Sequence, residues 1–273
     1  MNINDLRALR DTAIFAARQA GTSIMQLYDI TDFETKSDGS PVTVADCAAH
    51  DIIHALLKKT HITILSEESD GISLPYPEYL WIIDPIDGTK GFINSTGDFA
   101  IMIGLIKQGV PILGVVYAPA RDSLYYALRG EGAYVVHNGI TKKLLLSEYT
   151  HTPLRFVCSS NHYNTHMEYV REKLGAVKVP MGGFGIKTTF ITENKGDFFF
   201  TGASLGEWDV CAPHCILEEA GGTVTDCYGK PLIHGNPDHR IASGAIFSHP
   251  ACHTDIQNAI HHAYEESTKQ VFR

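Results

Sequence analysis

The stretch of residues 81–92 limits the possible folds of this chain more than any other. It reads Trp-Ile-Ile-Asp-Pro-Ile-Asp-Gly-Thr-Lys-Gly-Phe, an apolar and β-prone run that delivers two carboxylates. The proline and the first glycine favour a turn out of the strand, so Asp84 and Asp87 can face one point. Because Pro85 also lacks a backbone donor, the carbonyl of Ile86 is left to face a ligand. Carboxylate and carbonyl oxygens bind hard cations, so the stretch predicts a cation site at a strand end, with a simple Asx-turn as the alternative.

The same stretch also suits an anionic ligand. Thr89 places a hydroxyl beside the two carboxylates, and Gly88 and Gly91 let a bulky anion approach the backbone. The stretch therefore combines a cation site with a place for an anion.

The overall charge excludes some partners. Lys and Arg number 22 against 31 Asp and Glu, which gives a net charge of -9. This balance argues against non-specific binding to nucleic acid or to an anionic membrane surface. A small anionic substrate would therefore need local help, most simply from bound cations.

Length and hydropathy bound the architecture. The 273 residues, 44% of them hydrophobic, suffice for one large domain or two fused domains. The N-terminus has no basic and apolar leader pattern, and no later run is long enough to span a bilayer. These features predict a cytoplasmic protein without an integral membrane segment. They leave open a peripheral membrane association and the choice between monomer and homodimer.

Residues 1–150 are expected to form an N-terminal part in which helices pack on an antiparallel sheet. Apolar residues recur with helical spacing from Leu6 to Tyr28, which predicts a helix ending near Asp29. A second helix carries the apolar residues at 52–57. The strands predicted after it are 61–65, 98–106, 112–117, 123–128 and 133–136, in addition to the apolar run before Asp84.

Two groups of acidic residues in this part have more than one interpretation. Asp46 lies near the start of the second helix, where it or Thr43 could simply cap the helix. Glu67 and Glu68 directly follow a predicted strand, where acids form either a solvated loop or a bank of ligands.

Residues 151–273 are expected to form a C-terminal part of the α/β type, because helices and strands alternate there. A polar stretch at 140–153 marks the boundary. The glycine-rich run 181–185 is either an anion cradle or a tight strand-to-helix turn. Asp209 opens a helix, where an acid could be a ligand or only stabilise the helix dipole. The predicted strands are 154–158, 176–179, 197–201, one at Val224 and 241–247; the helices are 165–174, 185–193, 206–220 and a last one ending near 262, before a frayed polar tail.

Two patterns imitate transition-metal sites. The run His-Asp-Ile-Ile-His at 50–54 is close to the zinc-peptidase helix motif, but Asp stands where its Glu belongs and no third ligand is evident. A solvated helix face is the better interpretation. Cys211 and Cys215 share one helix face, where small buried cysteines are common, and reduced thiols are expected.

Taken in order, the motifs resemble the inositol monophosphatase superfamily, and the resemblance covers nearly the whole chain. The run Lys-Gly-Phe at 90–92 and the run 111–119 are similar to those of the 3′(2′),5′-bisphosphate nucleotidases. Phe184 and Gly185 stand where bacterial nucleotidases tend to have paired serines that lie near the substrate. The motifs that carry the resemblance are Ser-Pro-Val-Thr-x-Ala-Asp at 40–46, Leu-Ser-Glu-Glu at 65–68, Asp-Pro-Ile-Asp-Gly-Thr at 84–89, Trp-Asp at 208–209 and Glu-Ala-Gly-Gly at 219–222.

The resemblance implies a layered αβαβα sandwich, of α+β and α/β character, and Mg²⁺-dependent hydrolysis of a phosphomonoester with two or three ions. A first Mg²⁺ would be held by Glu67, Asp84 and the carbonyl of Ile86. A second would be held by Asp84, Asp87 and Asp209. Oxygen ligands of this kind suit Mg²⁺ better than zinc.

The resemblance also implies catalytic and substrate-binding residues. Thr89, helped by Asp46 and Glu68, would orient and deprotonate the attacking water. The residues implied in substrate binding are Glu67, Ile86, Asp87, Gly88, Thr89, Lys187 and Asp209.

The implied substrate is adenosine 3′,5′-bisphosphate, which would lose its 3′-phosphate to give AMP in a reaction linked to sulfur metabolism. The phosphosulfate analogue is a further candidate substrate. The alternatives are an inositol monophosphatase or a fructose-1,6-bisphosphatase and, in another class, a metal-binding regulatory protein with a dead active site. Retention of every implied ligand and of Thr89 argues against a dead site.

Overall fold

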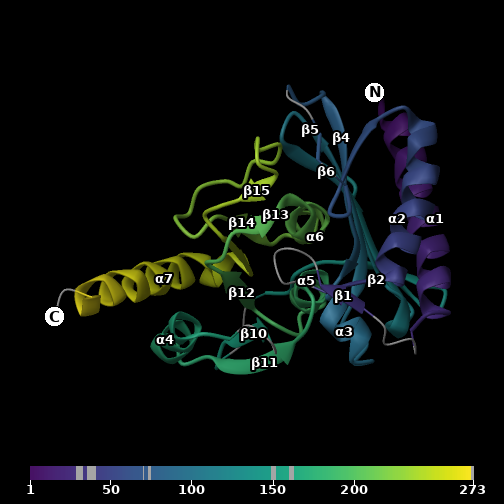
Figure 1. Cartoon of the computed structure of the whole chain (residues 1–273). Helices are drawn as coiled ribbons and strands as arrows, with labels where there is room; N and C mark the ends of the chain where they lie inside the picture. Colours follow the sequence, from purple (N-terminus) through teal and green to yellow (C-terminus); the bar gives the residue numbers. More distant parts are fainter. Residues whose placement is uncertain are drawn as a thin grey trace.

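The structure is a computed structural model that describes residues 1–28, 33–35, 41–69, 71–72, 75–148, 152–159 and 163–271. Its layers are helices, a seven-stranded sheet, helices, a five-stranded sheet and helices. Figure 1 shows α1 and α2 on one outer side, α5 and α6 between the sheets, and α4 and α7 on the other side. The predicted αβαβα sandwich is confirmed.

The first layer consists of α1 (Ile3–Met25) and α2 (Val44–Leu57). The buried face of α1 is made largely of alanine, which lets this helix lie close to the sheet. At Gly21 the approach is closest, because a Cβ there would meet the Tyr117 ring at 2.3 Å. The helix is confirmed, but it ends at Met25 with Gln26 as its cap, earlier than the end predicted near Asp29.

The seven-stranded sheet has the order β3-β4-β5-β6-β7-β8-β9. β3 runs parallel to β4 and the other neighbouring pairs are antiparallel, so the prediction of a wholly antiparallel sheet is wrong at this edge. β9 was not predicted either. It is an edge strand whose side chains are exposed apart from Leu144, so it lacks the apolar alternation of a covered strand. The strands are β3 (Thr63–Ser66), β4 (Tyr79–Asp87), β5 (Ala100–Lys107), β6 (Val110–Ala118), β7 (Ser123–Leu128), β8 (Gly132–His137) and β9 (Ile140–Leu144).

The middle layer consists of α5 (Phe184–Thr192) and α6 (Glu207–Glu219). α6 is buried on nearly all sides, as expected for a helix that lies between two sheets. Its close approach to the first sheet needs glycine: a Cβ at Gly114 would lie 2.4 Å from the carbonyl oxygen of Ala212.

The second sheet has the order β11-β10-β12-β16-β14 and is built from residues after 154. Stacked aromatic rings fill its outer side, with Phe156 and Phe198 4.7 Å apart between ring centroids. α4 (Thr165–Lys173) and α7 (Pro250–Val271) cover that side. The strands are β10 (Arg155–Ser159), β11 (Val177–Met181), β12 (Phe198–Thr201), β14 (Thr223–Thr225) and β16 (Ala245–Ser248).

The last helix is longer than predicted. Helical backbone continues to Val271, whereas the sequence pattern predicted an end near residue 262 and a frayed tail. The tail is polar, but Glu, Gln and Lys are good helix formers, so the helix continues past Ala263, the last buried residue in the part of the helix whose side chains are described. No helix within the described ranges combines the length and apolar composition needed to cross a membrane.

The short elements are β1 (Phe33–Thr35), β2 (Pro41–Thr43), α3 (Thr89–Ile93), β13 (Leu205–Gly206), β15 (Arg240–Ile241) and 3₁₀ turns at Lys58–Thr60 and Pro119–Arg121.

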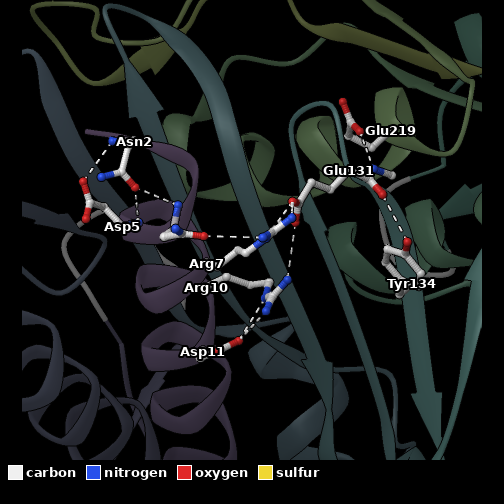
Figure 2. A network of polar contacts seen from close by, with 10 residues as sticks. Asn2, Asp5, Arg7, Arg10, Asp11, Glu131, Tyr134 and Glu219 are labelled. Atoms are coloured by element: carbon white, nitrogen blue, oxygen red, sulfur yellow. Dashed lines mark hydrogen bonds and ion pairs between the residues drawn. The ribbon is translucent and has the colours of Figure 1, made fainter.

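The turn between β7 and β8 ties helices on both faces of the first sheet together (Figure 2). On one face, Arg7 and Arg10 of α1 form ion pairs with Glu131 in this turn. On the other face, Glu219 of α6 accepts hydrogen bonds from the backbone N–H groups of Gly130 and Gly132, at 3.0 and 2.8 Å. The turn therefore links the first helical layer to the middle one.

Candidate active site

The acidic residues of the first half gather where β3 and β4 end. Because the two strands are parallel, with Ser66 opposite Ile83, the residue after β3 lies beside the acids of β4. The Glu67 N–H donates to the Ile83 carbonyl at 3.1 Å. Asp84 pairs with Met102 on β5, and the register then shifts before Asp87. The predicted turn at Pro85 is thus a bulge inside the strand, and β4 continues to Asp87.

Asp84 is the most strongly perturbed acid of the group. Its side chain is 1% exposed, and its Oδ1 atom is buried with no hydrogen-bond partner. Burial raises the pKa of Asp84 well above its ordinary value, and the nearby charges of Glu67, Asp87, Asp209 and Asp46 raise it further. The structure therefore brings the acids predicted from both halves of the chain within electrostatic reach of one another.

Asp87 is held by the start of α5. Its two carboxylate oxygens accept hydrogen bonds from the N–H groups of Phe184 and Gly185, at 2.8 and 2.7 Å. Gly183 has φ +63°, and a Cβ there would come within 2.9 Å of Oδ2 of Asp87. Burial raises the pKa of Asp87, while these hydrogen bonds and the Lys187 ammonium act in the opposite direction. The glycine-rich run is therefore both a strand-to-helix turn and an anion cradle, and the anion is a carboxylate of the chain itself.

Asp209 comes from the middle layer. It is the third residue of α6, and its Oδ2 atom accepts a hydrogen bond from the Gly206 N–H at 2.8 Å. Burial, with the charges of Asp87 and Glu67, raises the pKa of Asp209 to about 7. Asp209 thus caps its helix and lies within electrostatic reach of the other acids, while its role as a metal ligand stays a prediction.

The remaining predicted residues lie around the start of α2 and α3. Thr43 caps α2, and Asp46 accepts hydrogen bonds from the N–H and the hydroxyl of Thr43, at 2.7 and 2.5 Å. The hydroxyl of Thr89 donates to the Ile86 carbonyl at 3.3 Å. Gly88 has φ +83° and precedes α3, whose first turn has no side-chain cap. The joint catalytic role of Thr89, Asp46 and Glu68 stays a prediction.

The donor set fits hard divalent cations. Among the residues that the structure describes, no three acid, histidine or cysteine side chains already stand at metal-binding separation. However, the buried Oδ1 of Asp84 lacks a donor, and each carboxylate that accepts backbone hydrogen bonds retains unused lone pairs. Lys187 and Arg240 offset only part of the negative charge. A hard divalent cation would stabilise a buried group of carboxylates with this excess of charge.

A cavity of about 240 Å³ is lined in part by Phe184 and Lys187 of α5, the helix whose start binds Asp87. Lys187, half-buried on α5, places its Nζ atom over the rings of Phe184 and Phe199, 5.8 and 5.3 Å from their centroids. Burial lowers the pKa of Lys187, and the charges of Asp87 and Asp209 oppose this shift. Other lining residues include Ser159, Met167 and Leu205. The cavity therefore joins a cation to an aromatic wall next to the acidic group.

Sequence reasoning missed one residue close to the site. His50 was assigned to a solvated helix face, but its half-buried ring lies 2.9 Å from the hydroxyl of Ser66, the residue before Glu67. The available signal was its spacing, because His50 follows Asp46 by one helical turn and so shares its face.

Comparison with known sequences agrees with this geometry. Residues 5–268 match the model of the inositol monophosphatase family. The 3′(2′),5′-bisphosphate nucleotidase CysQ of Escherichia coli O6:H1 is 37% identical over 240 residues, which are 83% of this chain and 96% of that protein. The CysQ protein of Buchnera aphidicola is 34% identical over 254 residues, covering 90% of this chain and 93% of its own length.

Solved structures share the fold. A crystal structure of CysQ from Bacteroides thetaiotaomicron is similar with a TM-score of 0.78 at 30% identity, covering 88% of this chain and 97% of that one. An IMPase of Thermotoga maritima is similar with a TM-score of 0.79 at 28% identity, covering 94% of this chain and 98% of that one. From sequence motifs, layered fold and these similarities together, the chain belongs to the inositol monophosphatase family.

Proposed function

We propose that this protein is a Mg²⁺-dependent phosphomonoesterase that removes the 3′-phosphate of adenosine 3′,5′-bisphosphate. The names of its relatives support a bisphosphate nucleotidase. The observation in the structure that carries the proposal is the cavity around Lys187. It offers an ammonium group and aromatic rings beside a group of metal-binding acids, and an adenine nucleotide with two phosphates presents a matching base and two anions.

The residues proposed to coordinate Mg²⁺ are those that the family resemblance implies. Glu67, Asp84 and the carbonyl of Ile86 would hold one Mg²⁺, and Asp84, Asp87 and Asp209 a second. When bound, such ions neutralise the phosphate and acidify a water molecule. The unpartnered Oδ1 of Asp84 supports its place at the centre of the set.

Thr89 would orient the attacking water. Its hydroxyl already donates to the Ile86 carbonyl, so its oxygen is left to accept a hydrogen bond from a water molecule on its other side. Asp46 and Glu68 would take up the proton. The uncapped first turn of α3 would receive a phosphate oxygen through the backbone around Gly88 and Thr89.

Lys187 would receive the second phosphate of the substrate. An ammonium group that faces aromatic rings is only partly neutralised, so it gains from a phosphate dianion. An inositol monophosphate has neither a second phosphate nor a base for the aromatic wall. The cavity therefore favours the nucleotide over the inositol phosphates.

A substrate panel tests the proposal. Phosphate release would be measured with adenosine 3′,5′-bisphosphate, its phosphosulfate analogue, adenosine 3′-monophosphate, inositol 1-phosphate and fructose 1,6-bisphosphate, with and without Mg²⁺. We expect the highest kcat/KM for adenosine 3′,5′-bisphosphate, with AMP as the product, and no turnover after chelation of Mg²⁺. Equal turnover of inositol 1-phosphate would contradict the proposed substrate, and no turnover of any compound would support the dead-site alternative.

The Lys187→Gln variant separates recognition of the second phosphate from the chemistry. This change should raise KM for adenosine 3′,5′-bisphosphate and leave adenosine 3′-monophosphate almost unaffected, because only the first substrate carries the second phosphate. An equal effect on both substrates would place Lys187 outside the specificity site.

A further inference from the structure

His50 makes a specific contact beneath the acidic turn. It lies on α2, one helical turn after Asp46, and its Nδ1 atom is 2.9 Å from the Oγ atom of Ser66. Ser66 is the last residue of β3 and is 1% exposed. A buried hydroxyl needs partners, so this contact is not an incidental one on the surface.

The hydroxyl of Ser66 organises the turn that carries the two glutamates. The N–H group of Glu68 donates to Oγ of Ser66 at 3.3 Å. The hydroxyl of Ser69 donates to the Ser66 carbonyl at 2.9 Å, and the Glu67 N–H is bound to β4 through Ile83. The backbone of both glutamates is therefore fixed, on one side by β4 and on the other by the Ser66 hydroxyl.

The direction of the hydrogen bond follows from this arrangement. Because Oγ of Ser66 accepts from the Glu68 N–H, its own proton can point to Nδ1 of a neutral His50 ring that is protonated on Nε2. Burial and the neighbouring His54 lower the pKa of His50, which favours this neutral form. His54 stacks on the ring with centroids 5.6 Å apart. His50 thus fixes the rotamer of Ser66.

We propose that His50 is a positioning residue that acts through Ser66 to present Glu67 and Glu68 to the acids of β4. The inference rests on the proposed function for its catalytic consequence. Its structural part, the placement of a metal-binding carboxylate by His50, can be measured without any substrate. Partners that orient a ligand typically change metal affinity by about 10–100-fold when they are removed. Since His50 acts through one intermediate residue, we expect the lower end of that range.

The test compares four variants by Mg²⁺ calorimetry without substrate, and then by kcat and KM. His50→Ala removes the ring. His50→Asn keeps an acceptor near the position of Nδ1, whereas His50→Gln moves it toward the position of Nε2. His54→Ala is the matched control, because it removes the stacked ring one turn further along the same helix but leaves the contact to Ser66.

We expect His50→Ala and His50→Gln to bind Mg²⁺ about tenfold more weakly and to lose kcat with little change in KM. His50→Asn should recover most of both losses, and His54→Ala should behave like the wild type. Thermal unfolding checks that each variant is folded. If His50→Ala does not fold, the contrast between Asn and Gln still decides the question.

Ser66→Ala provides the second arm. If His50 acts through Ser66, the double variant His50→Ala/Ser66→Ala should bind Mg²⁺ with about the same affinity as whichever single variant binds it more weakly. Wild-type Mg²⁺ affinity in His50→Ala, an equal loss in His54→Ala, or additive losses in the double variant would each overturn the inference. Suppose that His50→Ala shows the expected loss of Mg²⁺ affinity but the wild-type protein hydrolyses none of the substrates. That result would overturn the proposed function and leave the positioning role of His50 in place.

Discussion

Charged residues gather at two ends of the seven-stranded sheet, and the two groups differ in how their charges are balanced. The turn between β7 and β8 follows Leu128 at one end, and the acids near Asp87 lie at the other. At the turn, Arg7 and Arg10 pair with Glu131, and two backbone N–H groups bind Glu219. At the acidic end, burial raises the pKa values of Asp84, Asp87 and Asp209, and repulsion from neighbouring acids raises those of Asp84 and Asp209 further.

The difference separates charges that hold the fold from charges that hold a ligand. A charged side chain that is ion-paired and partly exposed contributes modestly to stability, and its charge is already neutralised, so it does not attract a ligand. A buried group of one sign costs free energy of folding until cations neutralise it. Each of the following changes tests this division, from the largest expected effect to the smallest.

Asp84→Asn should abolish activity. Asparagine keeps the shape of the side chain but removes the charge at the centre of the acidic group. Since metal ions contribute several kcal/mol to stabilising the transition state, kcat should fall by about 10³–10⁴-fold. The metal-free variant should also unfold at a higher temperature than the wild type, because a repelled buried charge is gone. A lower unfolding temperature in the absence of Mg²⁺ would show that this charge is balanced after all.

Thr89→Val should slow the reaction while leaving the metal site in place. The variant keeps the size of the side chain but loses the hydroxyl that would orient water, so kcat should drop by about 10²-fold or more. Mg²⁺ affinity, measured by calorimetry, should be unchanged. Thr89→Ser is the matched control, since it retains the hydroxyl and should keep most of the activity. Wild-type kcat in the valine variant would reduce Thr89 to a residue of the turn.

Asp209→Asn should produce a smaller, metal-dependent defect. The amide oxygen can still accept from the Gly206 N–H, so the helix cap remains. The second cation loses one negative ligand, and we expect kcat to fall by about 10–100-fold, with partial recovery at high Mg²⁺. A Mg²⁺ titration that overlays the wild-type curve would remove Asp209 from the site.

The same variant should change the pH dependence of stability. In the fold the pKa of Asp209 is about 7, above its ordinary value of 3.8. The stability that this group contributes is fully present below pH 3.8 and is lost as the pH rises through 7. Without metal, the unfolding temperature of Asp209→Asn should therefore rise relative to that of the wild type as the pH increases between these values. Mg²⁺ should make the two unfolding temperatures more similar again. A constant gap would contradict the raised pKa.

Glu219→Gln at the opposite end should affect stability alone. Its two carboxylate oxygens accept one backbone N–H group each, and glutamine offers a single acceptor. The free energy of unfolding should fall by about 1 kcal/mol, with kcat and Mg²⁺ affinity unchanged. Denaturant titration and a phosphate-release assay measure the two quantities. A loss of activity larger than the loss of folded protein would mean that the two ends of the sheet are coupled.

The local pattern of apolar and polar residues was enough to predict most of the helices and strands, and the position of Asp84 and Asp87 at the end of a buried strand. The apolar run before Asp84 predicts a buried strand, and the order of the motifs indicates the family and the layered fold. β9 could not be predicted, because an exposed edge strand lacks apolar alternation. The parallel pairing of β3 with β4 depends on how the intervening segment is packed, which a local pattern does not contain.

The contacts between segments far apart in the chain could not be predicted from the sequence either. The hydrogen bonds from Phe184 and Gly185 to Asp87 join the two halves of the chain, and neither spacing nor composition predicts that the glycine-rich run receives this particular anion. His50 illustrates the same limit at shorter range. The motif around it suggested zinc or solvent, whereas its partner, Ser66, is determined by where α2 packs on the sheet.

The helix α6 carries a residue of each charged group, Asp209 in its first turn and Glu219 at its last residue. The rise of an α-helix sets these residues about 15 Å apart along the axis, and each added or missing residue would rotate one against the other by about 100°. Both ends are fixed to other parts of the molecule: Gly206, just before the helix, pairs with Arg240 of β15, and Glu219 is bound at the turn between β7 and β8. The length of α6 is therefore a fixed dimension of the protein, and a single insertion or deletion within it cannot satisfy both ends, even where each individual substitution along the helix is tolerated.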